Sequence, residues 1–405
     1  MTAWLSVGII LTLAANLFVL VRWGGVTCIG VTPVKSVSFI AILFTSGLDV
    51  GLIMFPLTEF PVYADVVTNP EYAFSNPLAI EFGFWGFLVW SLYFLTCFYF
   101  CVIEPKVKFF DIGLVKLVNN VIIIGTCAFT ASLFLSNLPW YLPQLGDGES
   151  IGIGFYLLVL VVIAGAVHSS SNLRYVRLLS LGSTALFLGL TVFMGLLFGF
   201  ATDDSVTKLL SNLSLVINYF EQLPQFVLPI NSYHEFYLYW WFAWSIMIGQ
   251  FTARFVGGFK TWQLLLAMLV VPSVLIAVWF TVLYSVYAHD IAIAGPVSML
   301  MAFVGVVFVV NSLDSLIRLY TDNLNLGLQR LGYRGYFLGN LAVLAILTLL
   351  FQLDFLKIEW VGALVIVLFL SCLTYIFLKR RTQVLAIRGS PPENRLDFDK
   401  IQSAH

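Results

Sequence analysis

Residues 236–254 read Phe-Tyr-Leu-Tyr-Trp-Trp-Phe-Ala-Trp-Ser-Ile-Met-Ile-Gly-Gln-Phe-Thr-Ala-Arg, a mainly apolar run that ends at a basic residue. The run is about as long as the roughly 20 residues that a helix needs to cross the hydrocarbon core of a bilayer. It carries tryptophans at positions 240, 241 and 244. At about 100° per residue, these three side chains project from one side of a helix. The stretch therefore predicts a membrane-spanning helix with a tryptophan-rich face.

The composition of the whole chain agrees with a membrane protein. Of the 405 residues, 60% are apolar and 10% are charged, whereas soluble proteins have about 45–50% and about 25%. This composition excludes a water-soluble enzyme. The net charge of −1 offers no polybasic surface, so we expect no nucleic-acid partner. The five cysteines lack the spacing of disulfide or metal sites, and we interpret them as packing residues.

Apolar runs of similar length recur and predict about eleven transmembrane helices, with membrane lipid around them. They lie near 3–22, 34–54, 79–102, 117–140, 151–168, 178–200, 235–256, 262–288, 294–320, 335–351 and 357–378. A further stretch, 207–230, mixes polar and apolar side chains, which is typical of an amphipathic helix at the interface. We therefore expect one all-α transmembrane domain over 1–378 and a basic cytoplasmic tail over 379–405.

Basic loop residues mark the cytoplasmic side of a membrane protein, and here they occur in every second loop. The opposite loops hold only Lys208 and Lys357, together with acids such as Glu59 and Asp290. We therefore expect a multi-pass protein of the cytoplasmic (inner) membrane, with its N-terminus outside and its C-terminus in the cytoplasm. The basic set is Arg22, Lys35, Lys106, Lys108, Lys116, Arg174, Arg177, Arg254, Lys260, Arg318, Arg330, Arg334, Lys379, Arg380, Arg381, Arg388, Arg395 and Lys400.

One acid lies inside a predicted span. Asp49 sits in the segment Gly47-Leu48-Asp49-Val50-Gly51. An ionisable side chain at mid-span costs at least about 2.5–3.5 kcal/mol, so it is normally retained for a partner or a pathway. The two glycines weaken the helix and can free backbone carbonyls, such as those near Leu48, toward a cavity. A buried acid paired with a neighbouring helix is the alternative, and we favour a functional site.

Aromatic side chains form a triplet on each of two predicted helices. An interfacial aromatic belt explains either triplet alone equally well. Because both triplets accompany a broken helix with an acid, we favour a box of aromatic ring faces around a quaternary ammonium group. Each ring would contribute about 0.5–2 kcal/mol of binding free energy through cation–π attraction. The residues are Trp85, Trp90 and Tyr93 on the predicted helix over 79–102, and Trp240, Trp241 and Trp244 on the helix over 235–256.

Polar residues inside two other predicted helices are candidates for an ion site. Asn311 and Ser312 begin the cluster Asn-Ser-Leu-Asp-Ser, and Thr126 and Thr130 lie one turn apart on the helix over 117–140. Interhelical hydrogen bonding explains such residues about as often as ion binding does. With freed carbonyls near Leu48, their oxygens would suit a hard cation. No phosphate loop, zinc-type histidine pair or catalytic triad is visible, so we expect neither an enzyme nor a cofactor nor a metal other than sodium.

These motifs resemble the betaine/choline/carnitine transporter family. The segment 236–254 is similar to that family's tryptophan-rich signature helix, and Phe84-Trp85-Gly86 with Trp90 and Tyr93 is similar to its second aromatic helix. Residues 311–315 resemble its Thr-Ser-Ala-Asp-Ser stretch, and 47–51 resemble its Gly-x-Gly-x-Gly segment. Two positions depart from the family pattern. Asp49 replaces the central glycine, and Asn311 replaces a threonine that helps to form a sodium site in sodium-coupled members.

The resemblance implies a LeuT-type core of two inverted five-helix repeats with substrate at mid-membrane. The repeats would cover 34–200 and 235–378, preceded by one extra N-terminal helix (1–33) where the family usually has two. The segment 201–234 would be the interfacial amphipathic helix through which family members commonly form homotrimers. The same resemblance implies either sodium or a proton as the coupling ion.

We therefore predict ion-coupled secondary transport of a small trimethylammonium compound. Choline is favoured, because the carboxylate of a zwitterion would be repelled by a charged Asp49. If Asp49 is protonated, glycine betaine, carnitine or a sulfonium analogue remains possible. A non-transporting membrane sensor that binds such an osmolyte is a second hypothesis, although the tail has only about 27 residues with no recognisable module.

Overall fold

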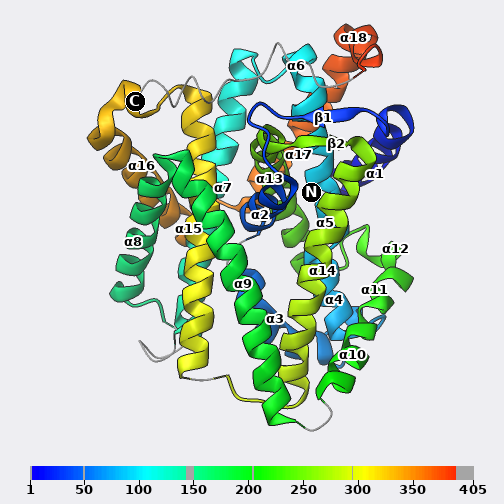
Figure 1. The fold of residues 1–405 in the computed structure, drawn as a ribbon, viewed down its shortest axis with the longest axis vertical. Helices are drawn as coiled ribbons and strands as arrows, with labels where there is room; N and C mark the ends of the chain where they lie inside the picture. The colour runs from blue at the N-terminus through cyan, green and yellow to red at the C-terminus, as the bar shows by residue number, and fades with distance from the viewer. Residues whose placement is uncertain (1, 49–50, 143–149, 203–204, 294, 389–405) are drawn as a thin grey trace.

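The computed structural model describes residues 2–48, 51–142, 150–202, 205–293 and 295–388, and these are almost entirely helical (Figure 1). The first elements are α1 (Thr2–Trp23), β1 (Thr27–Ile29), α2 (Ser36–Ser46), α3 (Gly51–Ala64), η1 (Pro70–Tyr72), α4 (Pro77–Trp85), α5 (Leu88–Phe98), η2 (Tyr99–Ile103), α6 (Glu104–Val107), α7 (Gly113–Tyr141), α8 (Ile153–Ser170) and α9 (Leu173–Ala201). They are followed by α10 (Ser205–Leu215), α11 (Ile217–Glu221), α12 (Leu223–Phe226), α13 (Ser232–Thr252), η4 (Ala253–Phe255), β2 (Gly257–Lys260), α14 (Thr261–Ala288), α15 (Pro296–Leu324), α16 (Leu328–Gln352), α17 (Ile358–Tyr375), η5 (Ile376–Arg380) and α18 (Arg381–Leu385).

The predicted helical membrane protein is confirmed in outline. Within the described ranges, nine helices are long and apolar enough to cross a membrane, and α2 with α3, bent by 50°, would make a tenth span. The remaining predicted span is α13, in which every residue from Tyr237 to Gly249 is buried. Because α13 lies among other helices, it tolerates polar groups that a lipid-facing helix would not. Eleven spans stay a prediction.

Two of the predicted helices are interrupted. The run over 34–54 divides into α2 and α3 around the segment that holds Asp49, as its glycines predict. The run over 79–102 was predicted as one helix, which is wrong, because it breaks at Gly86 and Phe87 into α4 and α5. Phe87 has a left-handed φ of 40°, and its N–H is satisfied by the Ser273 hydroxyl of α14 at 2.8 Å. Trp85 therefore ends α4, whereas the other two aromatic residues of that triplet lie on α5.

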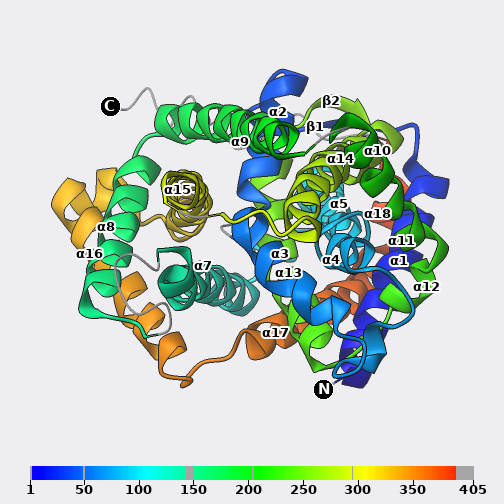
Figure 2. The same ribbon diagram turned by 90° about the horizontal axis from the view of Figure 1, so that it is seen from below.

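The helices pack in two groups, which Figure 2 shows from below. The broken helices α2 to α5 pack with α13 and α14, and α7 and α8 pack with α15 and α16. The first two predicted spans of the first half, α2/α3 and α4/α5, thus contact the first two of the second half, α13 and α14. The third and fourth spans, α7 and α8, contact α15 and α16 in the same way. Two repeats related by inversion would give this pairing. The repeat itself and the domain limits drawn from it stay predictions.

Polar links join the basic loops at one end of the molecule, where α6, α18 and the strands lie (Figure 1). The strands β1 and β2 pair antiparallel there, a feature that the sequence did not predict. All six basic loops therefore lie at the same end, as their alternation along the chain requires. The remaining links are the hydrogen bond from Arg22 to the Leu385 carbonyl, the ion pair of Arg254 with Asp322, the contacts of Arg318 with the carbonyls of Ser170 and Ser171, and the packing of α18 on α6.

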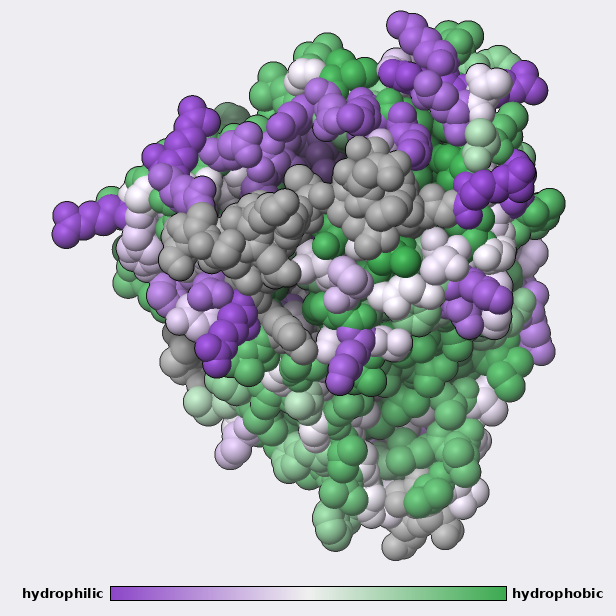
Figure 3. Space-filling model, turned by 45° about the horizontal axis from the view of Figure 1, so that its top comes forward, coloured by the Kyte–Doolittle hydropathy of each residue, from purple (hydrophilic) through white to green (hydrophobic). Residues whose placement is uncertain are grey.

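The surface has the two zones that a membrane protein needs. Hydrophilic side chains gather at the end that carries the basic loops, and mainly apolar side chains cover the part below it (Figure 3). Large apolar side chains are exposed on many of the long helices, for example Val192 on α9 and Val367 on α17. Lipid rather than water is the solvent that such a belt favours.

The predicted interfacial helix over 207–230 forms three short helices instead of one. Pro224 lies in the first turn of α12, where its missing N–H is tolerated but a preceding helix cannot run through it. Val206 and Leu210 on α10 and Ile217 on α11 leave 69%, 63% and 57% of their surface exposed. The opposite side is anchored by hydrogen bonds from Asn212 to Ser285, from Ser75 to Asn218 and from Asn76 to the Leu215 carbonyl.

Close packing of α13 on α5 yields a stability prediction. A Cβ added at Gly249 would lie 2.0 Å from the Thr96 hydroxyl oxygen and 2.7 Å from the backbone nitrogen of Cys97. Since α5 backbone cannot move aside freely, Gly249→Ala should destabilise the protein by about 1–3 kcal/mol. Gly182→Ala on α9, where a Cβ meets nothing within 4 Å, is the matched control. Thermal unfolding in detergent measures both, and equal midpoints would contradict the packing argument.

Candidate functional site

The glycines that flank Asp49 lie directly against two tryptophans. A Cβ on Gly47 would be 2.9 Å from the ring of Trp90, and a Cβ on Gly51 would be 2.6 Å from the ring of Trp85. Glycine is therefore needed at both positions for the break to approach the rings. Asp49 itself lies outside the described residues, but its two glycine neighbours place the break at the aromatic cluster.

The backbone around this break is met by side chains of three other helices. Ser312 of α15 donates its hydroxyl hydrogen to the carbonyl of Leu48 at 2.7 Å, and Tyr93 of α5 contacts the carbonyl of Gly47 at 3.4 Å. Trp279 of α14 donates its indole N–H to the carbonyl of Leu52 at 2.8 Å. A broken helix inside a membrane bundle needs such donors, because no water is there to replace the lost helical bonds.

The predicted ion-site residues are only partly brought together. Leu48 and Ser312 are in contact, as described. Thr126 and Thr130 are buried, but they donate to carbonyls of their own helix α7, those of Ile122 and Thr126. Asn311 accepts a hydrogen bond from Ser180 of α9 at 3.1 Å, and its Nδ2 has no partner among the described residues. Cys127 lies 4.0 Å from the Leu313 carbonyl, so α7 does pass α15 at this level.

The predicted aromatic residues form one buried cluster across three helices. The ring of Trp85 contacts those of Trp240 and Trp241 edge-on, with centroids 5.7 and 5.1 Å apart. Trp240 and Trp241 are stacked at 4.8 Å, and Tyr93 is 6.5 Å from Trp241 and 5.1 Å from Trp90. Exposure of all five side chains is at most 1%. Five of the six aromatic residues that the sequence singled out thus meet in one cluster, and their role as a substrate box stays a prediction.

The indole N–H groups of the cluster differ in their partners. Trp241 donates to the Phe84 carbonyl at 2.7 Å and Trp90 to the Trp85 carbonyl at 3.2 Å, so both bind backbone at the break between α4 and α5. The N–H groups of Trp85, Trp240 and Trp244 are buried with no acceptor among the described residues. Trp244 is fully buried on α13, one turn beyond the cluster. Buried donors are normally satisfied, so these three are available to an acceptor on a ligand.

Sequence reasoning missed two residues beside the cluster. Tyr237 of α13 contacts the rings of Trp85 and Trp240, with centroids 5.8 and 5.5 Å apart, and it continues the same helical face one turn earlier. Glu81 of α4 is fully buried. The rule that singled out Asp49 applies equally to an acid within 79–102, so Glu81 could have been found. Glu59 was assigned to an outer loop, which is wrong, because it is buried within α3.

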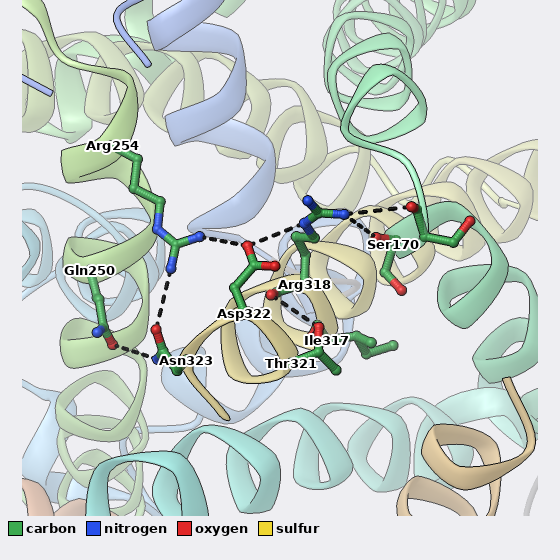
Figure 4. Close-up of polar contacts among 9 residues, drawn as sticks. Ser170, Gln250, Arg254, Ile317, Arg318, Thr321, Asp322 and Asn323 are labelled. Carbon is green, nitrogen blue, oxygen red and sulfur yellow. Dashed lines mark hydrogen bonds and ion pairs between the residues drawn. The ribbon is translucent and has the colours of Figure 1, made fainter. Parts of the chain in front are cut away.

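A second polar site lies at the end that carries the basic loops. One carboxylate oxygen of Asp322 is 3.1 Å from Arg254 and 3.2 Å from Arg318, and Arg318 also reaches the carbonyl of Ser170 (Figure 4). Burial lowers the pKa of the Arg254 guanidinium, and the charge of Asp322 opposes that shift. The network connects η4, the end of α15 and the end of α8.

A cavity of about 420 Å³ opens beside this network. Amide side chains join its walls, since Gln250 accepts hydrogen bonds from Asn119 at 3.1 Å and from Asn323 at 3.5 Å. Arg254 and Asp322 lie on the same wall. The cavity therefore opens at the basic end of the molecule, against the C-terminal end of α13.

Comparisons with known proteins identify the chain's relatives. The family model described as BCCT, betaine/carnitine/choline family transporter, matches residues 149–304. The glycine betaine transporter OpuD of Bacillus subtilis is 24% identical over 63% of this chain and 56% of its own length. The glycine betaine/proline/choline/ectoine transporter VP1456 of Vibrio parahaemolyticus is 23% identical over 61% and 50%, and the high-affinity choline transport protein of Escherichia coli is 25% identical over 64% and 42%. The matched part thus spans about half the length of these relatives.

The shared carboxylate of Asp322 yields a prediction. In Asp322→Asn, Arg254 and Arg318 face each other without a counter-charge, and the stability should fall by roughly 2–3 kcal/mol. Adding Arg318→Gln should restore part of that loss, because it removes the repulsion. Asp354→Asn, at an exposed turn after α16, is the control. Thermal unfolding of the original protein and the three variants tests the network, and a double variant less stable than Asp322→Asn alone would contradict it.

Proposed function

Because residues 149–304 match the betaine/carnitine/choline transporter family and the relatives include glycine betaine and choline transporters, we propose that the chain carries a small quaternary ammonium compound across the membrane by ion-coupled secondary transport. The observation that carries the proposal is the buried aromatic cluster against the broken helix at 47–51. Trp85 and Trp90 contact the glycines of the break, and the rings of α13 complete the cluster. A trimethylammonium group cannot donate hydrogen bonds, so aromatic faces are its natural binding surface.

Opening and closing of the cluster would be part of the cycle. Trp85 is in edge contact with Trp240 and Trp241, so a ligand between them requires the rings to separate. Trp85 lies next to both helix breaks. The break at Gly86–Phe87 follows it in the chain, and the break between α2 and α3 brings Gly51 against its ring. Half-helices that end at mid-membrane are where transporters of this architecture hold substrate and ion.

Choline is the substrate that we favour. A carboxylate at Asp49 would attract the ammonium group of choline by about 4 kcal/mol at 4 Å and an effective dielectric near 20, before desolvation is subtracted. The carboxylate of glycine betaine would meet a like charge there. The relative from Escherichia coli is named as a choline transport protein, which agrees with this choice.

Glycine betaine is the alternative, with carnitine or a sulfonium analogue in the same class. Two of the relatives are named as glycine betaine transporters. The indole N–H groups of Trp85, Trp240 and Trp244 lack acceptors, and a substrate carboxylate could accept from them. The charge state of Asp49 decides between the two substrates.

Sodium is the coupling ion that Leu48 and Ser312 would suit. The Leu48 carbonyl and the Ser312 hydroxyl are already in contact, and Asn311 is the neighbouring residue on α15. Thr126 and Thr130 would have to release their bonds to α7 to join them. Such oxygen ligands suit a hard cation. A proton remains the alternative coupling ion.

We further propose that the helices form two inverted repeats, with the basic end of the molecule in the cytoplasm of an inner membrane. The exposed apolar face of α10 and α11 would then be the contact of a homotrimer. Its exposed side chains, Val206, Leu210 and Ile217, point away from the anchored side of this segment. Such an apolar patch is suited to a partner or to lipid.

Uptake into proteoliposomes tests the function directly. Radiolabelled choline, glycine betaine and carnitine are compared, each with and without sodium and with and without a pH gradient, at fixed voltage. Concentrative uptake of any one of them is the expected result. Saturable binding without flux would instead favour a membrane sensor, and neither binding nor flux would overturn the proposal.

Replacing ring faces should weaken substrate binding. Trp241→Ala should cost roughly 1–2 kcal/mol of binding free energy, since a desolvated cation–π contact is lost, and Trp241→Phe should retain part of it. Trp360→Ala is a control on α17, since this tryptophan is 51% exposed. Binding is measured by calorimetry in detergent. Unchanged affinity of the Trp241→Ala variant would remove this ring from the site.

Asp49→Asn separates the two substrates. The variant keeps the shape of the side chain and removes its charge, so choline binding should fall by tenfold or more, about 1.4 kcal/mol per tenfold, whereas glycine betaine binding should hold or improve. Glu71→Gln, at an exposed position near α13, controls for a general loss of negative charge. If both substrates bind Asp49→Asn as they bind the original protein, the preference for choline has no basis.

A further inference from the structure

A second acidic centre lies beside the aromatic cluster. Glu81 of α4 is fully buried, and neither of its carboxyl oxygens has a hydrogen-bond partner among the described residues. Glu59 of α3 is 6% exposed, α3 packs against α4, and the charge of Glu59 acts on Glu81 across this contact. Two carboxyls therefore share one buried site.

The two carboxyls have opposite environments. Glu59 accepts hydrogen bonds from three tyrosine hydroxyls, those of Tyr63 at 2.9 Å, Tyr237 at 2.8 Å and Tyr233. Three donors around one carboxylate stabilise its negative charge. Glu81 has none, and an isolated buried charge without donors is strongly disfavoured. Glu59 is thus built to be the charged member and Glu81 to be the neutral one.

Repulsion between the two carboxyls then requires a bound proton. Within the described residues, no lysine or arginine forms an ion pair with either acid, and the neighbours of Glu81 are Glu59, Tyr63 and Trp85. Two like charges in one buried site cannot both persist, so the pair holds at least one proton. The other titratable groups around the pair are Tyr72 on η1, Tyr233, Tyr237 and His234 on α13, and Glu71, which binds Asn231.

A cavity on the side opposite the basic loops comes close to the acid pair. This cavity of about 430 Å³ is lined by Tyr63, Pro77, Tyr284, Tyr287 and Asp290. Tyr63 lines this cavity and also donates its hydroxyl hydrogen to Glu59, so one side chain contacts both the cavity and the acid pair. The pair is also joined to the aromatic cluster. Tyr237 contacts the ring of Trp85, which lies one helical turn after Glu81.

We propose that Glu81 and Glu59 form the proton-binding site of this transporter, and that the proton is exchanged with the outer cavity as the aromatic cluster opens and closes. The inference rests on the proposed transport function and names a coupling site for it. Separation of the rings would move Tyr237 and Trp85 and so change the donors and the hydration of the acid pair. Protonation of the pair and occupancy of the aromatic cluster are thereby linked.

The test uses the full-length protein in proteoliposomes, with choline as the probe, or with glycine betaine if only that compound is transported. Uptake driven by a pH gradient without sodium is compared with counterflow, in which labelled substrate exchanges for unlabelled substrate without a gradient. Glu81→Gln keeps the shape and cannot exchange a proton. It should lose gradient-driven uptake by tenfold or more while its counterflow stays within twofold of the original. Asp354→Asn, at the exposed turn after α16, should leave both unchanged.

The outcomes separate this inference from the function on which it rests. Counterflow in the original protein, together with net uptake that does not respond to the pH gradient, would overturn the proton site but leave the transport function intact. Failure of counterflow for every quaternary ammonium compound would overturn the function itself. Infrared spectra give an independent readout if Glu81→Gln folds poorly. A protonated carboxyl band should be present in the original protein and shift in heavy water, and its absence would overturn the proposal.

Discussion

A backbone carbonyl released inside a membrane bundle needs a donor, and this requirement organises the centre of the protein. The breaks between α2 and α3 and at Gly86–Phe87 free backbone carbonyls, and side chains from other helices meet several of them. Ser312 reaches Leu48, Trp279 reaches Leu52, and Trp241 reaches Phe84. Because these donors come from α15, α14 and α13, the interruptions hold the two halves of the chain together.

The same requirement explains why α13 is central. It supplies the ring of Trp241 to the cluster and its N–H to the break, and its far end approaches α5 so closely that only glycine fits at position 249. A helix enclosed in this way is fixed along its length. Its ends are fixed too, by Tyr233 and Tyr237 on Glu59 at one end and by Arg254 on Asp322 at the other.

The sequence was informative where a residue type at a given position has only one structural explanation, such as paired glycines inside an apolar helix. The tryptophan triplet of α13 was recognised by its helical spacing, and the glycines of 47–51 indicated the first break. The break at Gly86–Phe87 could not be seen, because it depends on a donor, Ser273, that is 186 residues away in the chain. Thr126 and Thr130 illustrate the converse. Their spacing on α7 was read correctly, but a hydroxyl in a helix can bind its own backbone, and here it does.

The links among the loops at the basic end also determine how the chain responds to force. Arg22 at the end of α1 donates a hydrogen bond to the Leu385 carbonyl, which links α1 to α18, the last described helix. The β1–β2 pair then joins the segment after α1 to the segment after α13. A pull on the C-terminal end is therefore transmitted to α1 and the strands rather than to α17 alone. Mechanically, the hydrogen bond between α1 and α18 and the β1–β2 pair link the first and last described helices to the middle of the chain.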